Sequence, residues 1–145
     1  MSHVEDVAAN IDDLAALETA AKECGCELVR GQKTYRWYGQ HVGDYAMPEG
    51  VTEADLGKCD HAIRVKDADS RTYEIGVVAK PEGGYRLLYD FWQGGYGLMD
   101  KVGEKCTKLT TEYGVAKVCA NAYKHGYTAQ RVEQDGKTYV DVYTR

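Results

Sequence analysis

Apolar residues near the start of the chain recur at spacings of three and four, the period of one face of an α-helix. This stripe contains Leu14, Leu17, Ala21 and Cys24. Asn10 is a residue type that often caps the first turn of a helix, and Gly25 suits the left-handed conformation that ends one. The pattern therefore predicts a helix at residues 11–24, preceded by an edge strand through Val4 and Val7.

Alternating apolar and polar residues predict strands in the middle of the chain. The predicted strands are Cys26–Arg30, Thr34–Tyr38, Cys59–Val65, Arg71–Lys80 and Tyr85–Asp90. The connections between the last three are too short for parallel crossovers, so we expect antiparallel pairing. A long loop separates the second and third strands at residues 39–58. Within it, Thr52 and Asp55 have the spacing of a capping box around one helical turn.

The stretch Tyr85–Gly97 joins this sheet to a second helical pattern. It contains the only phenylalanine beside a tryptophan, at Phe91-Trp92, and ends in a cluster of glycines. The apolar stripe that follows contains Leu98, Val102, Cys106, Leu109 and Tyr113. A glycine inside a helix costs about 1 kcal/mol relative to alanine. We therefore expect a kink at Tyr113-Gly114 or two consecutive helices, ending at Lys124-His125-Gly126.

The last predicted element is a β-hairpin. Tyr127–Gln134 and Lys137–Thr144 flank Asp135-Gly136, a dipeptide typical of two-residue hairpin turns. Pairing outward from this turn sets Arg131 opposite Val140. The face expected to point to the core carries Tyr127, Ala129, Val140 and Val142, and the opposite face carries Val132, Tyr139 and Tyr143.

These elements predict an α+β fold. We expect an antiparallel sheet of five to seven strands with helices packed on one face, and a C-terminal β-hairpin. The 145 residues have the length of a single domain and are enough to bury a core, so we predict one domain at 1–145.

Composition and charge narrow the class of protein without indicating an activity. Hydrophobic residues make up 43% and charged residues 28%, as in ordinary globular proteins. No apolar run approaches the roughly 20 residues that span a bilayer. The net charge of −5 disfavours binding to nucleic acid. An odd number of cysteines, five, and the lack of a secretion signal favour reduced thiols in the cytoplasm, or in the host cytosol if a phage encodes the protein.

Short motifs spread over nearly the whole chain resemble a known family. They are Met1-Ser2-His3, Ile11–Leu17, Asp60–Arg64, Tyr73–Gly76, Gly84-Tyr85, Asp90-Phe91-Trp92, Gly97-Leu98, Lys108-Leu109, Glu112-Tyr113, Lys124–Tyr127 and the closing hairpin. On these residues the chain resembles domain of unknown function 1257, the conserved chloroplast reading-frame 35 type. That family occurs in plastid genomes of algae, in cyanobacteria and other bacteria, and in some phages. The resemblance implies no established activity and no catalytic residue.

The glycine cluster after Trp92 is the first candidate binding site. It precedes a predicted helix, and backbone N–H groups at a helix start can hold a phosphate or another anion. The predicted ligand-binding residues are Gly94, Gly95, Gly97 and Lys101. The Walker and G-x-G-x-x-G spacings are absent, and the G-x-x-G spacing alone does not indicate an RNA-binding module. The alternative is that the glycines only let the chain turn sharply.

Two closely spaced pairs, Cys24 with Cys26 and Cys59 with His61, are the candidates for a metal site. Such a set suits tetrahedral zinc, although paired ligands usually have at least two residues between them. The alternative, which we favour, is that the thiols pack in the core as small apolar groups. We therefore predict no metal and no other cofactor. Nothing positions a serine or cysteine beside His41 or His61, so we predict no catalytic residue.

Twelve tyrosines against one phenylalanine are the unusual feature of the composition. Tyrosine is enriched where proteins meet, which favours a partner contact on the second hairpin face and at the glycine corner. The predicted contact residues are Trp92, Tyr96, Val132, Tyr139 and Tyr143. The alternative is that the tyrosines pack in the core or cover the sheet.

The sequence leaves two main hypotheses for function. The first, which we favour, is a small non-enzymatic accessory or binding protein that contacts another protein through the tyrosine-bearing hairpin face and the Phe91–Gly97 corner. The second is a binder, or an enzyme, that holds a phosphorylated or anionic small molecule at residues 93–101. A zinc-stabilised module is a third. The oligomeric state stays open.

Overall fold

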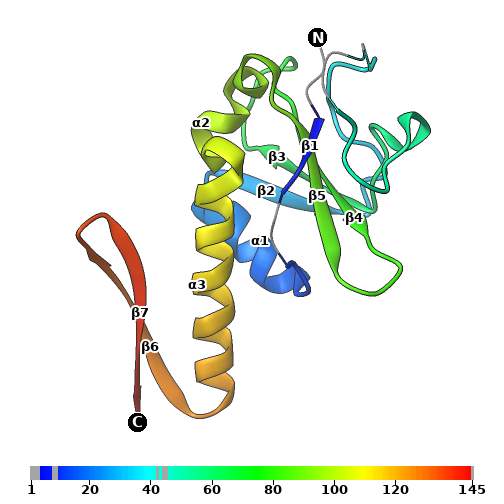
Figure 1. Ribbon diagram of the computed structural model, residues 1–145. Helices are drawn as coiled ribbons and strands as arrows, with labels where there is room; N and C mark the ends of the chain where they lie inside the picture. The colour runs from blue at the N-terminus through cyan, green and yellow to red at the C-terminus, as the bar shows by residue number, and fades with distance from the viewer. Residues whose placement is uncertain (1–3, 8–9, 42, 44–45, 145) are drawn as a thin grey trace.

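The computed structural model describes residues 4–7, 10–41, 43 and 46–144 (Figure 1). Met1-Ser2-His3, one of the motifs of the family resemblance, lies outside them. The described residues form a five-stranded antiparallel sheet with the order β1-β5-β4-β3-β2 and a separate two-stranded sheet. The strands are β1 (Val4–Asp6), β2 (Cys26–Arg30), β3 (His61–Val65), β4 (Ile75–Ala79), β5 (Tyr85–Asp90), β6 (Tyr127–Gln134) and β7 (Lys137–Thr144).

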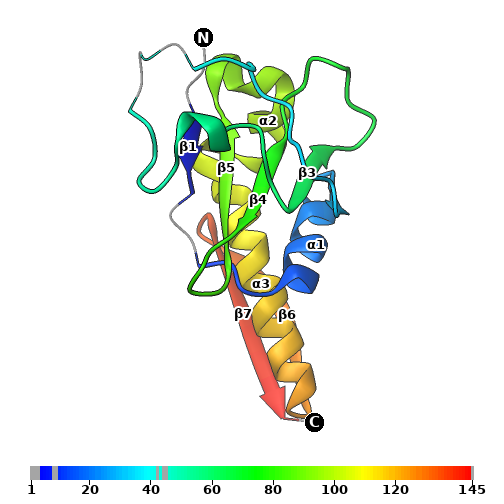
Figure 2. The same cartoon turned by 90° about the vertical axis from the view of Figure 1, so that its right-hand side faces the viewer.

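Three α-helices, α1 (Leu14–Glu23), α2 (Leu98–Val102) and α3 (Thr107–Lys124), lie on one side of the five-stranded sheet (Figures 1 and 2). The described residues also form three short 3-10 helices, η1 (Glu53–Asp55), η2 (Trp92–Gly97) and η3 (Glu104–Cys106). The predicted α+β fold is confirmed, with its antiparallel sheet, its helices on one face and its terminal hairpin. None of the described helices is long and apolar enough to cross a membrane.

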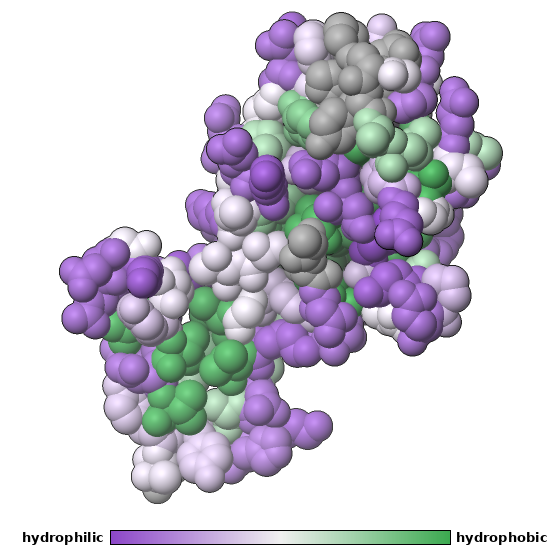
Figure 3. Space-filling view, viewed as in Figure 1, coloured by the Kyte–Doolittle hydropathy of each residue, from purple (hydrophilic) through white to green (hydrophobic). Residues whose placement is uncertain are grey.

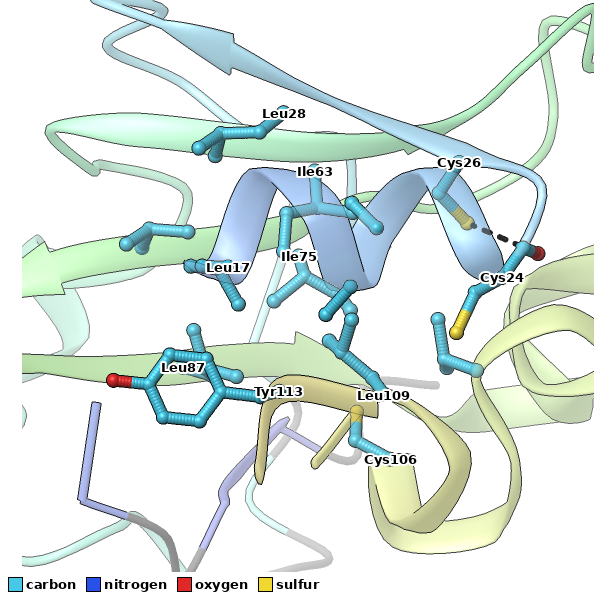
Figure 4. Packing of buried hydrophobic residues seen from close by; sticks show 14 of the residues in the cluster. Leu17, Cys24, Cys26, Leu28, Ile63, Ile75, Leu87, Cys106, Leu109 and Tyr113 are labelled. Carbon is cyan, nitrogen blue, oxygen red and sulfur yellow. Dashed lines mark hydrogen bonds between the residues drawn. The ribbon is translucent and has the colours of Figure 1, made fainter. Parts of the chain in front are cut away.

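The core between the sheet and the helices is built from every second residue of the strands, because alternate side chains of a strand point to opposite faces. Figure 4 shows Ile63, Ile75 and Leu87 of the sheet beside Leu17 of α1 and Leu109 of α3. All five are at most 1% exposed. This helix-side cluster includes the whole predicted stripe from Leu98 to Tyr113.

The opposite face of the sheet is covered by the long β2–β3 connection instead of by a helix. There Ala62 and Leu88 pack with Tyr35, Val51 and Leu56 in a second, loop-side cluster. The predicted capping box is confirmed, with Thr52 and Asp55 enclosing η1. The prediction of a strand at Thr34–Tyr38 is wrong, since this segment makes only an isolated bridge from Thr34 to Lys58. Tyr35, within this segment, contributes its ring to the loop-side cluster.

The first helix begins at Leu14, three residues later than predicted, and its N-cap is Asp13, not Asn10. Ile11 instead bridges to Tyr85 and is only 1% exposed. The hydroxyl of Tyr113, from α3, accepts hydrogen bonds from the backbone N–H groups of Asp12 (2.9 Å) and Asp13 (3.1 Å). The Asp13 side chain caps the helix locally by accepting from the Ala16 N–H (3.0 Å), and Tyr113, 100 residues away, binds the backbone just before the first turn.

The second helical stripe is broken at Gly103 and not at Tyr113-Gly114, where we expected a kink or a division. Gly103 has φ 84° and ψ 161°, a conformation that essentially only glycine adopts. Lys105 and Cys106 follow with positive φ, and α3 then runs unbroken through Gly114. The apolar spacing continues across the break, so the hydrophobic pattern did not reveal it.

These two glycines provide a matched pair of substitutions. A Cβ at Gly103 would lie 2.9 Å from the backbone nitrogen of Lys108, whereas no described atom lies within 4 Å of a Cβ at Gly114. We expect Gly103→Ala to lower the free energy of unfolding by about 2 kcal/mol, and Gly114→Ala to raise it by up to about 1 kcal/mol. Urea denaturation of both variants measures these changes. A destabilising Gly114→Ala would contradict the continuous helix.

The terminal hairpin has the predicted register, with Arg131 opposite Val140 and Ala129 opposite Val142. Both strands pack against α3, and in both views the hairpin and the end of α3 project beyond the five-stranded sheet (Figures 1 and 2). The expectation that one hairpin face belongs to the core is wrong, because Tyr127 and Val142 stay 42% and 47% exposed.

Candidate functional site

Exposed large apolar side chains gather in two places on the described surface. Six of the eight lie on the C-terminal half of α3 or on the hairpin: Val118, Tyr123, Tyr127, Tyr139, Val142 and Tyr143. We call this region, residues 115–144, the arm. The other two, Tyr38 and Tyr96, line one cleft near the glycine corner. Exposed apolar side chains that gather in this way are candidates for interaction sites.

The arm contains an apolar groove between α3 and the hairpin. Its volume is about 370 Å³, and Val118, Ala122, Tyr127 and Val142 line it together with Asn121 and His125. Figure 3 shows hydrophobic atoms gathered in the hollow between the hairpin and α3. The face predicted to be core thus lies towards the helix, but solvent still reaches it.

One ion pair fastens the hairpin to the helix. Arg131 of β6 donates to the carboxylate of Glu112 in α3, and the Glu112 side chain is only 7% exposed. Arg131 also pairs with Glu133 at 2.7 Å. The hydrogen bonds to Glu112 and then to Glu133 raise the pKa of the Arg131 guanidinium. This contact sets the distance between β6 and α3 and therefore the width of the groove.

The predicted partner-contact residues do not form one surface. Tyr139, Tyr143 and Val132 share the hairpin face opposite to the groove residues, since successive strand residues alternate between faces. Trp92 and Tyr96 lie in η2, just before α2. This segment is near the start of α3, whereas the connection to β6 follows the other end of that helix (Figure 1). Trp92 is half-buried and packs against the helix-side cluster.

The glycine corner is a left-handed turn. Gln93, Gly94, Gly95 and Tyr96 have φ between 52° and 65°. Two hydrogen bonds hold this turn to residues 72–73, which precede β4. The Tyr73 N–H donates to Gly95 O (2.9 Å), and the Thr72 hydroxyl donates to Tyr96 O (2.9 Å). Left-handed backbone costs about 1–2 kcal/mol for each residue that is not glycine.

The predicted anion-binding residues lie in different surroundings. Gly94 lines a cleft of about 640 Å³ whose charged residues are Glu5, Asp100, Glu104 and Lys105, an excess of negative charge. The stem of Lys101 instead lies beside Gly25 at the end of α1. The helix that begins after Gly97 has only five residues. An anion site at Gly94, Gly95, Gly97 and Lys101 stays a prediction.

The predicted zinc candidates are not brought together. Cys24 and Cys26 lie in the helix-side cluster, where the Cys26 thiol donates to the Cys24 carbonyl at 3.8 Å (Figure 4), whereas Cys59 lies in the loop-side cluster. Nδ1 of His61 accepts from the Gly31 N–H at 3.0 Å. Burial raises the pKa of both Cys26 and Cys59 to about 11, so these thiols are protonated at neutral pH. The described residues contain no group of three or more potential metal ligands.

A cleft of about 390 Å³ combines aromatic rings with two guanidinium groups, and sequence reasoning did not find it. It is lined by Arg36, Trp37, Tyr38, Arg71, Tyr73 and Tyr96. The rings of Tyr73 and Tyr96 meet edge to face, with centroids 5.2 Å apart. The available signal was the run Arg36-Trp37-Tyr38 in a predicted strand, but its neighbours come from two other segments.

A buried carboxylate positions two walls of this cleft. Asp90, at the end of β5, is fully buried. Its oxygens accept from the backbone N–H groups of Tyr38 (3.1 Å) and Trp92 (3.0 Å), which ties the loop segment to the glycine corner. Burial, followed by the charge of Asp90 and the neighbouring Tyr96, raises the pKa of Tyr73 to about 12. The Tyr73 hydroxyl therefore stays protonated at neutral pH.

No family model, no curated protein and no solved structure matches the chain. The family resemblance therefore stays a prediction, and the function has to be argued from the surfaces themselves.

Proposed function

We propose that the protein is a non-enzymatic binding protein that acts through a protein–protein contact made by the arm, and that the partner is a second copy of the chain. The observation that carries this proposal is the edge of β7, eight residues long, in a hairpin that pairs with no other strand among the described residues. An exposed strand edge is a template for pairing with another chain.

The hairpin turn determines which backbone groups face outward. Asp135 and Gly136 have φ of 53° and 74°, as in a type I′ turn, so Gln134 and Lys137 are the closing hydrogen-bonded pair. In an antiparallel ladder the hydrogen-bonded pairs then recur at every second residue. The outward N–H and C=O groups of β7 are therefore those of Thr138, Val140, Val142 and Thr144.

A second copy fits this edge when a twofold axis passes beside Val140. Each β7 strand then pairs antiparallel with its counterpart, and the outward groups of Val140 meet those of the other Val140. In this register Thr138 lies opposite Val142, Tyr139 opposite Asp141, and Lys137 opposite Tyr143. No like charges meet. The result is a four-stranded sheet with the apolar residues of each groove on one side.

We expect the protein to be a dimer and Val140→Pro to be a monomer, as measured by light scattering after size-exclusion chromatography. Proline removes the outward N–H of residue 140, which makes no bond to β6, and proline is tolerated on edge strands for this reason. Val140→Thr keeps the N–H and the branched shape, so this control should remain dimeric. A wild-type protein that stays monomeric at its highest soluble concentration contradicts the proposal.

A charge pair tests the register independently of the backbone. Tyr139→Lys places a cation opposite Asp141 of the other copy, whereas Tyr139→Asp places like charges opposite each other. Directly opposed charges contribute roughly 0.2–1 kcal/mol each, and the symmetry doubles the effect. We expect the dissociation constant of Tyr139→Asp to exceed that of Tyr139→Lys by about tenfold, at low salt. Equal constants would show that this register is wrong.

We place this activity in a reducing compartment, the cytoplasm, as the sequence predicts. All five cysteines are free thiols, and four of them are buried.

A further inference from the structure

The aromatic cleft near the glycine corner holds the two exposed large apolar side chains that the arm does not account for. Tyr38 and Tyr96 are 45% and 43% exposed and belong to different segments of its lining. Trp37 and Tyr73 also line the cleft, although Tyr73 is largely buried and the indole of Trp37 packs against the loop-side cluster. Aromatic faces that remain in water on a folded protein are the stacking platforms that planar ligands use.

The backbone holds one of these rings in place at a cost. Tyr96 has φ 53°, which a residue with a side chain rarely adopts, although its ring stays exposed. The hydrogen bond from Thr72 to the Tyr96 carbonyl and the edge contact with Tyr73 fix the ring over the cleft. Strained backbone that yields little burial is typical of functional sites.

The same cleft offers two cations that have little else to bind. The Arg36 guanidinium donates one hydrogen bond among the described residues, to the Thr72 carbonyl at 2.8 Å, and forms no ion pair with them. A guanidinium has five N–H donors, so most of them remain open to a ligand. Arg71 pairs with Asp69, but both side chains are more than half exposed, so this ion pair is weak and can exchange.

We propose that this cleft binds a nucleoside phosphate, with the base stacked on Tyr38 and Tyr96 and the phosphate paired with Arg36 and Arg71. Aromatic rings stack on any nucleobase, and the planar guanidinium binds phosphate in a bidentate manner. The volume, about 390 Å³, lies in the range of small-molecule sites. The net charge of −5 favours a single nucleotide over a long strand, which needs an extended basic surface.

The test is a titration of the full chain with AMP, GMP, CMP and UMP, followed by NMR shifts and calorimetry. We expect binding of at least one nucleotide, with shifts at residues 36–38, 71–73 and 96. Adenosine lacks the phosphate and inorganic phosphate lacks the base, so each should bind at least about tenfold more weakly than the nucleotide. A short single-stranded RNA in a separate arm distinguishes a free nucleotide from one within a strand. Binding of the RNA alone would overturn the proposal.

Matched variants show whether nucleotide affinity depends on the cleft itself or on the loss of any exposed ring or positive charge. Tyr96→Asn and Arg71→Ala should each weaken binding by about tenfold or more. Tyr123→Ala and Arg64→Ala remove an exposed ring and an exposed guanidinium elsewhere, and should leave the affinity unchanged. Asparagine tolerates left-handed backbone, so the melting temperature of Tyr96→Asn should not fall. The proposal is wrong if no nucleotide binds at millimolar concentration, or if the controls weaken binding as much as the cleft variants.

Discussion

Arg131→Ala is expected to lower the free energy of unfolding by about 2–4 kcal/mol and to release the hairpin from α3. The substitution leaves the Glu112 carboxylate, 7% exposed, without its cation, and an unpaired buried charge is strongly destabilising. The Arg131 side chain is 39% exposed, so water moderates the loss. Urea denaturation gives the energy, and amide exchange of β6 and β7 should accelerate more than that of the five-stranded sheet.

Two comparisons show whether the buried partner is the cause. Arg64→Ala removes an ion pair with Glu27 in which both side chains are more than one-third exposed, and should cost less than about 1 kcal/mol. The double variant Glu112→Gln with Arg131→Met leaves no unpaired charge and should recover part of the lost stability. If Arg131→Ala and Arg64→Ala cost the same, the Glu112 pair does not fasten the arm.

Gly76→Ala is expected to destabilise the protein by about 2–3 kcal/mol, because the loop-side core has no room for a methyl group there. A Cβ at this position would lie less than 3.0 Å from two ring atoms of Tyr35. Gly76 pairs with Ala62 in β3 and Leu88 in β5, so neighbouring strands restrict any shift of the backbone. Thermal and urea unfolding both measure the loss.

The contact with Tyr35 can be isolated with a double-mutant cycle. Tyr35→Ala alone opens a cavity and should itself cost about 3–5 kcal/mol. In that background the added methyl group of Gly76→Ala has space, so its cost should nearly vanish. An undiminished cost in the Tyr35→Ala background would locate the strain in the strand and not in the ring.

Local patterns predicted the parts of the fold that local chemistry controls. The Asp135-Gly136 turn determines the hairpin register, and the stripe from Leu98 to Tyr113 is buried as its spacing indicates. The errors lie at helix ends. Asp13 caps α1 through its side chain, which accepts from the Ala16 N–H, and the Tyr113 hydroxyl binds the preceding backbone from 100 residues away. The later helices divide at Gly103, whose conformation an apolar stripe does not reveal.

The candidate sites also differ in how far a short stretch of sequence predicts them. Tyr139, Tyr143 and Val132 share a strand face, which alternation alone predicts, whereas their contact with a partner stays a prediction. The aromatic cleft draws on three segments, at residues 36–38, 71–73 and 96, that are far apart in the sequence. The ligand prediction at Gly94 and Lys101 relied on sequence proximity, but these residues border different surroundings.

The position of β1 at the edge of the sheet has a consequence for synthesis on the ribosome. Glu5, in β1, receives a hydrogen bond from the hydroxyl of Tyr89, 84 residues later in the chain. At roughly 5–20 residues per second, translation takes about 4–17 s to produce that partner. During this interval Val4, 4% exposed in the finished protein, has no sheet to join. β1 can therefore join the sheet only after β5, the strand with which it pairs, has been synthesised.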